Sequence, residues 1–581
     1  MLERVDQDKR VAAVLSAAPL PVRAVPSTLH ASLIARLDRI GAAAKEIAQI
    51  GAVLGREFSY ELIEPVAQRN EGELQAALAQ LSEAGLLFCR GTPPHALYLF
   101  KHALLQDAAY GTLLRARRQE LHARVAAVLE QHFADLVERQ PELLAHHLAA
   151  AGDTERAVDQ WLKAGKHAAS RLAHVEALRH LDRGLALLRS LADGPMRDAR
   201  EIELQLALGT SSITVNGMSA PRVGEAYARG HELARKRGDQ RQQFQALYGL
   251  WQHNSGSGRI VAARPLSARL LRMTEHARDS GLRLQAHHSA WTTGLLGGDP
   301  ADGYQHAEAG IRIYDPEEHR SHRNIYGGHD PGACALYTGG LLEWLLGYPD
   351  SALARIDKAQ ALAERISHPF SMEIAVTYAA MLHLNRGEPE LATARIAVAE
   401  AIAAEQRVSF IIEPLFLRGA VLVQQGAAAE AITVIREGLA SRRPMATVWQ
   451  SYARCFIAEA FMREGNYPEA HVAVRQALDG IEATGERMWQ PEIHRIHGLV
   501  LLDENKPVES EAAFSQALHL ARERQSKSLE LRAATSLARL WGEQGRRAEA
   551  RELLAPVYGW FAEGFDTADL KDAKALLAEL G

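Results

Sequence analysis

The feature that most constrains this sequence is a short pattern that returns along the chain at a nearly constant interval. Each copy is a glycine or asparagine followed, five positions later, by a small residue. Residues 449–478 give the clearest copy, in which Gly465 precedes Ala470 and, seven positions further on, Ala477. Other copies begin at Gly347, Gly387, Gly426, Asn505 and Gly545. A fixed period of about 40 residues indicates stacked helix pairs, in which each pair buries its apolar face against the next.

Large apolar residues repeat with the same period. They lie 16 or 17 positions before the turn positions, at Phe370, Phe410, Trp449, Trp489 and Leu529. Trp251 and Trp291 form a further pair, one period apart. The favoured interpretation places these side chains in the core between repeats, because stacked neighbours must bury such rings. The alternative is that Phe410, Trp449 and Trp489 line the inner surface of the array and contact a ligand.

One interval in the array is longer than the rest. The step from Gly298 to Gly347 exceeds those between the later copies, and residues 314–335 within it are rich in glycine, histidine and proline. We expect an inserted loop here, and long loops in repeat arrays often line a binding face. Tyr326, His329 and Asp330 are therefore candidates for contact with a ligand or partner.

The same segment holds the densest cluster of residue types that bind metals. Imidazole and carboxylate suit zinc and other transition metals. The candidates in this segment are His319, His322, His329, Asp330 and Cys334. Their spacing matches no standard site, and a glycine-rich loop gives no rigid geometry, so the prediction is hydrogen-bonding histidines with no metal and no other cofactor. His146 and His147 are adjacent on a predicted helix and point about 100° apart, which excludes joint binding of one ion.

The hydrophobic period changes near the N-terminus. Helical patterns fill residues 26–84, and residues 86–90 and 96–100 then form two candidate strands around a Gly-Thr-Pro-Pro turn. Helices followed by a β-hairpin give the element order of a winged-helix domain. We expect a mainly α chain with a lead-in segment at 1–25, a winged-helix-like domain at 26–134 and a helical-repeat array at 135–581.

Charge argues against a protein that holds nucleic acid. The net charge is −5 with both signs dispersed, whereas nucleic-acid-binding domains carry a basic patch or stripe. The predicted recognition helix of the winged-helix domain, residues 70–83, carries three glutamates and no lysine or arginine. Nucleic acid is therefore not an expected partner, and Arg115, Arg117 and Arg118 are better candidates for contacts between domains.

Cysteine usage and hydropathy bear on the compartment. The three cysteines, Cys89, Cys334 and Cys455, are isolated and form no paired motif, which favours a reducing cytoplasm. No run of about 18 apolar residues is present, so the sequence predicts no membrane-spanning helix.

Several stretches resemble STAND-type signalling ATPases. Residues 100–110 (FKHALLQDAAY) and 114–122 (LRARRQELH) resemble the segment after the winged helix in that family. Residues 33–40 and 53–58 resemble the start of its winged-helix module. Residues 326–332 and 347–350 resemble the tetratricopeptide-like region of bacterial adenylate/guanylate cyclase–ATPase fusions. The resemblance implies a winged helix followed by a tetratricopeptide-like array, an order shared with maltose-type transcription activators.

The resemblance also implies a function. The phosphate-binding pattern G-x4-GK-[ST] does not occur in the sequence, since Gly165-Lys166 is followed by His167. We therefore expect no enzymatic activity, although related proteins carry the label adenylate cyclase. The expected role is a regulatory, sensor and protein-interaction module that binds a protein partner or small-molecule effector on its array and acts on an ATPase–cyclase module. The alternatives are a stand-alone tetratricopeptide scaffold and a fragment of a transcription regulator.

Overall fold

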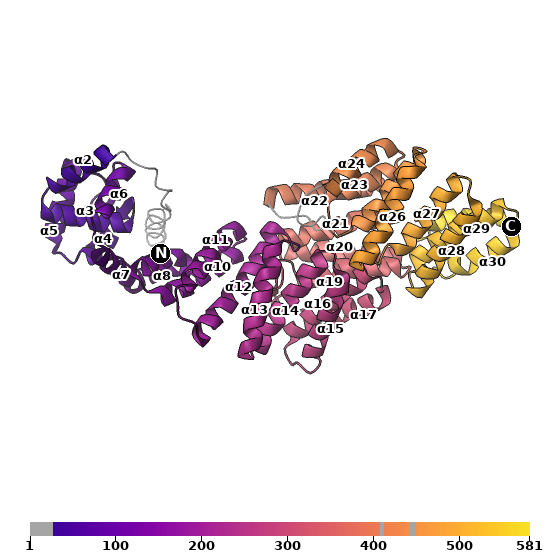
Figure 1. Cartoon of the computed structure of the whole chain (residues 1–581), viewed down its shortest axis with the longest axis horizontal. Helices are drawn as coiled ribbons and strands as arrows, with labels where there is room; N and C mark the ends of the chain where they lie inside the picture. Colours follow the sequence, from indigo (N-terminus) through magenta and orange to yellow (C-terminus); the bar gives the residue numbers. More distant parts are fainter. Residues whose placement is uncertain (1–26, 407–411, 441–447) are drawn as a thin grey trace. The chain divides into compact units, whose positions relative to one another are not determined.

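The computed structural model describes residues 27–406, 412–440 and 448–581. Within these ranges the chain forms two compact units, which divide between Leu204 and Gln205 (Figure 1). The predicted lead-in at 1–25 and the candidate residue Phe410 lie outside the described residues.

The first unit combines helices with a three-stranded antiparallel sheet of order β1–β3–β2. Its elements are α2 (Ser27–Asp38), α3 (Ala42–Leu54), β1 (Glu57–Ser59), α4 (Tyr60–Ala67), α5 (Glu71–Glu83), β2 (Leu87–Arg90), β3 (Leu97–Phe100), α6 (Ala103–Gly111), α7 (Arg115–His132), α8 (Ala134–Arg139), α9 (Pro141–Ala151), α10 (Thr154–Ser170) and α11 (His174–Leu188). The predicted hairpin is confirmed, because Leu87 of β2 lies opposite Phe100 of β3. The sequence pattern missed β1, since so short a strand shows no alternation.

Side-chain caps fix two helices of this unit. Ser59 accepts a hydrogen bond from the backbone N–H of Leu62 at 3.3 Å and begins α4. Asn70 accepts one from Glu73 at 2.9 Å and begins α5. Each contact satisfies one of the amide groups that a helix N-terminus leaves without a partner. The division at Leu204 lies beyond residue 134, the predicted end of the N-terminal domain, because α9 packs against α7 and α10 packs against α9.

The second unit is helical throughout its described residues and begins within α12 (Pro195–Asn216). Its further helices are α13 (Pro221–Arg237), α14 (Gln240–Gly256), α15 (Ile260–Thr274), α16 (Ser280–Gly297), α17 (Pro300–Ile313), α18 (His322–Ile325), α19 (Pro331–Leu345), α20 (Pro349–Arg365), α21 (Pro369–Arg386), α22 (Pro389–Gln406), α23 (Pro414–Gln424), α24 (Ala428–Ala440), α25 (Gln450–Arg463), α26 (Tyr467–Thr484), α27 (Gln490–Asp503), α28 (Pro507–Glu523), α29 (Lys527–Glu543), α30 (Arg547–Tyr558) and α31 (Ala568–Leu580).

The predicted turn positions are where the first helix of each pair ends. Gly347, Gly387, Gly426, Gly465, Asn505 and Gly545 all have positive φ, between 62° and 96°. This left-handed conformation is the usual way for a helix to end, and glycine adopts it without steric cost. The small residues five positions later, which start the second helix, are completely buried at Ala352, Ala392, Ala431, Ala470, Ser510 and Ala550. The predicted repeat is confirmed, and the fold class is mainly α with a tetratricopeptide-like helical solenoid.

The first helices of the central repeats are almost wholly buried. Every residue of α19 except Leu336 is buried, and α21 is similar. Helices distant in sequence cover them: Ser526 donates a hydrogen bond to the carbonyl of Leu345 at 3.4 Å, and Ser528 donates one to the carbonyl of Trp344. Much of the inner face of this array is therefore occupied by packing, and the space left for a ligand lies in local cavities and grooves.

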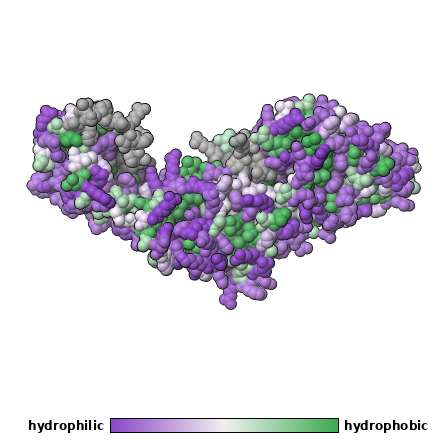
Figure 2. All heavy atoms as spheres, viewed as in Figure 1, coloured by the Kyte–Doolittle hydropathy of each residue, from purple (hydrophilic) through white to green (hydrophobic). Residues whose placement is uncertain are grey.

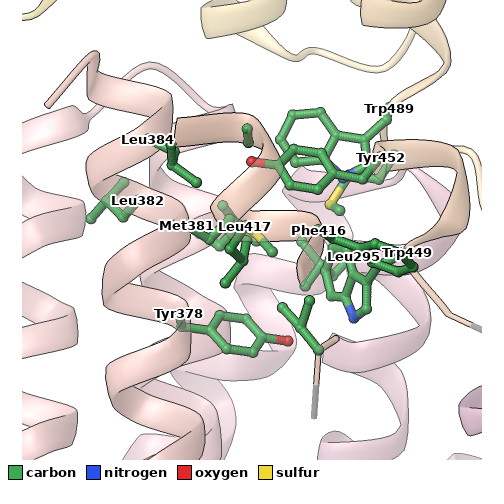
Figure 3. Packing of buried hydrophobic residues seen from close by; sticks show 14 of the residues in the cluster. Leu295, Tyr378, Met381, Leu382, Leu384, Phe416, Leu417, Trp449, Tyr452 and Trp489 are labelled. Atoms are coloured by element: carbon green, nitrogen blue, oxygen red, sulfur yellow. The ribbon is translucent and has the colours of Figure 1, made fainter. Parts of the chain in front are cut away.

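The periodic large apolar residues lie in this core. Trp251, Trp291, Phe370, Trp449, Trp489 and Leu529 are all buried, with 6% or less of each exposed. Trp489 packs against Tyr452, with ring centroids 4.5 Å apart (Figure 3). It also packs against Trp344, with ring centroids 6.0 Å apart. The prediction that the residues of this series are buried between repeats is confirmed for these six, while Phe410 lies outside the described residues. On the face drawn in Figure 2, hydrophilic residues predominate and hydrophobic ones form small areas.

Candidate functional site

A cavity of about 70 Å³ lies inside the second unit, between the first helices of successive repeats. Helices α14, α16, α19 and α21 contribute Trp251, His288, Cys334 and Tyr378, and Trp449 closes it just before α25. Figure 3 shows the rings of Tyr378 and Trp449 in this part of the core. The other lining residues are Met218, Gln252, Ser255, Gly256, Thr292, Leu296, His329, Tyr337, Thr338 and Val448. Aromatic walls with a few polar groups are typical of small-molecule sites.

Three side chains that can bind a metal meet at the wall of this cavity. His288 Nε2 lies 3.2 Å from His329 Nε2 and 3.1 Å from Cys334 Sγ. All three residues are buried, and their ligand atoms lie within 4.8 Å of one another. They come from three different segments, namely α16, the residues before α19, and the first turn of α19.

Burial keeps these three groups neutral. It lowers the pKa of His288 well below the usual histidine value and lowers the pKa of His329 to about 4. Burial also raises the pKa of the Cys334 thiol to about 11. Removing a charged form from water is costly, so near neutral pH both rings are unprotonated imidazoles and the cysteine is a thiol.

The opposite edges of both rings are held by oxygen atoms. His288 Nδ1 lies 3.0 Å from Gln285 Oε1 and 2.8 Å from the Tyr248 hydroxyl. His329 Nδ1 donates to the backbone carbonyl of Gly327 at 3.3 Å. Gln285 in turn donates its amide to His322 Nδ1 at 2.9 Å. These contacts orient the two rings so that their Nε2 atoms converge.

The inserted segment is folded and largely covered, which corrects the expectation of a glycine-rich loop without rigid geometry. Residues 314–330 include the short helix α18, and the predicted loop residues 331–335 are the first turn of α19. Thr210 of α12 donates to the carbonyl of Ile325 at 3.2 Å. The segment thereby holds His329 against α16.

The other candidate residues of the inserted segment do not line the cavity. Tyr326 packs against Tyr248, with ring centroids 5.2 Å apart. Asp330 caps α19 by accepting from the N–H of Ala333 at 2.9 Å, and it also accepts from the hydroxyl of Tyr314. His319 is buried and accepts from the backbone N–H of Asp315 at 3.0 Å, while His322 contacts Gln285. Of the predicted metal ligands, His329 and Cys334 have ligand atoms that converge with those of a third residue, His288, whereas His319 and His322 pack against each other with ring centroids 5.0 Å apart.

Of the residues predicted to contact a ligand, some line the cavity and others do not. His329 and Trp449 line the cavity, whereas Tyr326, Asp330 and Trp489 do not. Trp489 is completely buried in the core.

Sequence reasoning missed His288, which lies at the centre of the cluster. Its signal was the repeat itself, because His288 lies one period after Tyr248 and about one period before His329. Residues one period apart occupy neighbouring positions on stacked helices. Metal-binding motifs are recognised by short spacings in sequence, so a ligand one repeat away forms no such motif.

In the first unit, two of the three arginines predicted to contact other domains bind within their own unit. Arg117 forms ion pairs with Glu46 and Glu120, both at 2.8 Å. Arg118 lies over the ring of Tyr110 at 4.3 Å. Arg115 begins α7 and is exposed.

A second opening, of about 220 Å³, lies among α21, α23, α25, α27, α29 and α31. Its charged residues are paired with one another: Arg532 with Asp569 at 2.8 Å, and Arg495 with Glu492 at 2.7 Å. Because these charged side chains are already paired with one another, they are less available to bind a charged ligand.

Comparison with known sequences gives one curated relative. No protein-family model matches the sequence. An uncharacterized protein of Rhizobium meliloti strain 1021 is 27% identical over 531 residues, which cover 90% of this chain and 51% of that protein. The chain thus spans about half the length of this relative.

Comparison with solved structures gives distant likenesses. A STAND protein with a tetratricopeptide repeat sensor from Pyrococcus horikoshii aligns with 87% of this chain and 69% of its own, at 13% identity and a TM-score of 0.44. A Rap protein complexed with competence and sporulation factor aligns with 74% of this chain and 100% of its own, at 11% identity and a TM-score of 0.37.

No helix in the described part of the chain combines the length and the apolar character needed to span a membrane.

Proposed function

We propose that this chain is a non-catalytic sensor and protein-interaction module of a STAND-type signalling protein. Its helical-repeat array binds a small-molecule effector in the cavity of the second unit, and its N-terminal unit passes the bound state to an ATPase–cyclase module.

The cavity is the observation that carries this proposal. Successive repeats bring Trp251, His288, Cys334 and Tyr378 to the wall of one cavity, although each comes from a different helix. The site exists only while these repeats are stacked. A ligand that contacts all four helices therefore stabilises one arrangement of the array over others, which is the requirement for a sensor.

The element order of the first unit supports the proposal that this unit passes the bound state to an ATPase–cyclase module. Its helices α3, α4 and α5 are followed by the β2–β3 hairpin, the order expected of a winged-helix-like domain at 26–134. The stretch at 100–110 that resembles STAND proteins forms the end of β3 and most of α6. On this proposal the exposed Arg115 is a candidate contact with the ATPase module.

A ligand screen by thermal unfolding tests the cavity. Purified chain is heated with a panel of small solutes no larger than an amino acid, which suit a cavity of about 70 Å³. A ligand at 100 times its Kd adds about 2.7 kcal/mol to the free energy of unfolding. For any compound found, Y378F and T338V alter the cavity wall with little change in volume, while Y452F alters a buried tyrosine that does not line it. We expect the first two to weaken binding and the third to retain it; equal binding by all three contradicts the site.

Co-purification with an ATPase–cyclase module separates the signalling role from the alternatives. Binding to that module, changed by the cavity ligand, supports the proposal. Binding to other proteins without any effect on an ATPase favours a stand-alone scaffold, and salt-dependent binding to a specific duplex favours a transcription-regulator fragment.

A further inference from the structure

The convergence of His288, His329 and Cys334 needs an explanation that core packing alone does not supply. Three polar side chains from separate segments are buried with their ligand atoms facing one another. A core gains nothing from polar atoms that lack complementary partners, because each costs its desolvation free energy.

The two rings meet through their Nε2 atoms. A neutral imidazole carries one hydrogen: His329 holds it at Nδ1, which faces the Gly327 carbonyl, while His288 Nδ1 faces both Gln285 Oε1 and the Tyr248 hydroxyl. His329 Nε2 then presents a lone pair towards His288 Nε2 at 3.2 Å. The Cys334 thiol can donate to His288 Nε2, but among the described residues no donor other than a ring nitrogen faces His329 Nε2. An ion between the three atoms satisfies all of them.

Two of the three separations can be compared with those around a tetrahedral ion, and the third, between His329 and Cys334, is within 4.8 Å. Zinc binds histidine nitrogen at about 2.0–2.1 Å and thiolate sulfur at about 2.3 Å, which places two nitrogens about 3.3 Å apart and a nitrogen and sulfur about 3.5 Å apart. The observed separations from His288 Nε2, 3.2 Å to nitrogen and 3.1 Å to sulfur, are only slightly shorter. Small side-chain rotations admit the ion.

The surroundings are also those of a metal site. Metal-binding histidines donate their other ring nitrogen to a carbonyl or carboxylate, as His329 does to Gly327, and His288 Nδ1 faces the oxygen atoms of Gln285 and Tyr248. Thiolate with imidazole selects thiophilic ions over magnesium or calcium. Three protein ligands leave a fourth position, and the three residues line the cavity.

We propose that His288, His329 and Cys334 bind one thiophilic transition-metal ion, with zinc as the first choice, and that its open coordination position faces the cavity. Binding releases the thiol proton of Cys334 to solvent and forms one metal–sulfur and two metal–nitrogen bonds. The metal site itself is independent of the function proposed above. Only the use of the open position to bind an effector rests on that function.

Metal titration of the full chain tests the inference. Protein treated with a chelator and a reductant is titrated with zinc by calorimetry, and with cobalt to detect thiolate-to-cobalt charge-transfer absorption. We expect one tight site per chain with the cobalt–thiolate band. Because loss of an outer-shell partner already costs about 10–100-fold in affinity, C334S and H329Q should lose at least about tenfold.

Matched controls separate this site from adventitious binding. C455S removes the other buried cysteine, and H287Q removes the histidine next to His288; both should retain the tight site and, for C455S, the thiolate band. Thermal unfolding without metal shows whether each variant is folded. H288Q gives a second test should C334S fail to fold. No stoichiometric site in the wild type, or equal affinity in all variants, overturns the proposal.

The outcome for the metal is distinguishable from the outcome for the sensor function. A cavity ligand that binds equally with and without chelator, together with no tight zinc site, overturns the metal inference and leaves the proposed function standing. Tight zinc binding without any cavity ligand supports the metal inference and contradicts the proposed sensor function.

Discussion

The buried carboxylate of Glu486 accepts the backbone N–H of Trp449 with both oxygens, at 3.1 and 3.3 Å. Trp449 has a φ of 71°, a left-handed conformation that bulky residues rarely adopt. The Glu486 side chain thus holds the left-handed backbone of Trp449 at the point where the indole ring closes the cavity. A change in the protonation of Glu486 should therefore affect both the fold and the site.

This contact predicts an unusual pH dependence. Burial raises the pKa of Glu486 from its ordinary value of 4.5 to about 7. Between these values the folded chain holds a proton that the unfolded chain has lost, so the free energy of unfolding falls as pH rises, by about 3 kcal/mol in total. Above pH 7 the loss is complete. E486Q keeps one acceptor oxygen and carries no charge, so its stability should change less between pH 5 and pH 8.

Urea unfolding at pH 5 and pH 8 measures this difference. E482Q, which changes an exposed glutamate near the end of α26, is the control and should follow the wild type. The raised pKa of Glu486 predicts that E486Q loses less stability than E482Q between pH 5 and pH 8. An equal change in the free energy of unfolding in the two variants contradicts it.

Glu492, six positions further on, should behave in the opposite way. Its burial raises the pKa, but Arg495 and Arg532 outweigh that effect and lower the pKa to about 2. The ionised form then stabilises the fold above the unfolded value of 4.5, and this contribution is lost as pH falls towards 2. E492Q should cost about 3 kcal/mol at pH 7 and much less at pH 3. Acid titrations of the wild type and E492Q, followed by circular dichroism, measure this. A difference in stability between them that stays constant from pH 7 to pH 3 contradicts the prediction.

These two glutamates show what the sequence could and could not predict. The repeat period predicted the helix pairs, because Gly465 and its equivalents must end one helix and Ala470 and its equivalents must pack in the next. Glu492 has a local partner in Arg495 on the same helix, but the burial of both glutamates and the contact of Glu492 with Arg532 depend on other helices.

Local sequence patterns likewise predicted only part of the candidate site. His329 and Trp449 were predicted from the irregular interval and the aromatic series, whereas His288 was not. A residue in the regular part of a repeat carries no local sign that it faces a cavity. Its role became visible only when stacking placed α16 beside the inserted segment.

Arg386 should be a main link between the central and C-terminal repeats. Its side chain is only 3% exposed, and it donates to the carbonyl of Pro349 at 2.9 Å and to Asp350 at 2.9 Å. It also reaches Asp566, just before α31, at 3.3 Å. Since breaking a buried ion pair costs about 3–5 kcal/mol and these carboxylates are partly hydrated, we expect R386M to cost about 2–4 kcal/mol.

Hydrogen exchange tests where that loss occurs. Amides of α31 should exchange faster in R386M, because the contact at Asp566 is lost. R463M removes an exposed arginine paired with Glu459 on the same helix, and should change stability by less than about 0.5 kcal/mol. Faster exchange spread evenly over the unit, or none at α31, would show that Arg386 does not hold this helix.

Two glycines that differ only in backbone conformation test the repeat signature itself. Gly465 has a φ of 68° and ends α25, while Gly480 lies inside α26; a Cβ added at either meets no atom within 4 Å. G465A should therefore destabilise by about 1–2 kcal/mol through backbone strain alone, and G480A should stabilise by about 0.5–1 kcal/mol through helix propensity. Chemical unfolding of both variants at one pH gives the comparison. Equal effects would mean that the turn positions recur for a reason other than the left-handed conformation, such as contact with a partner at the exposed turns.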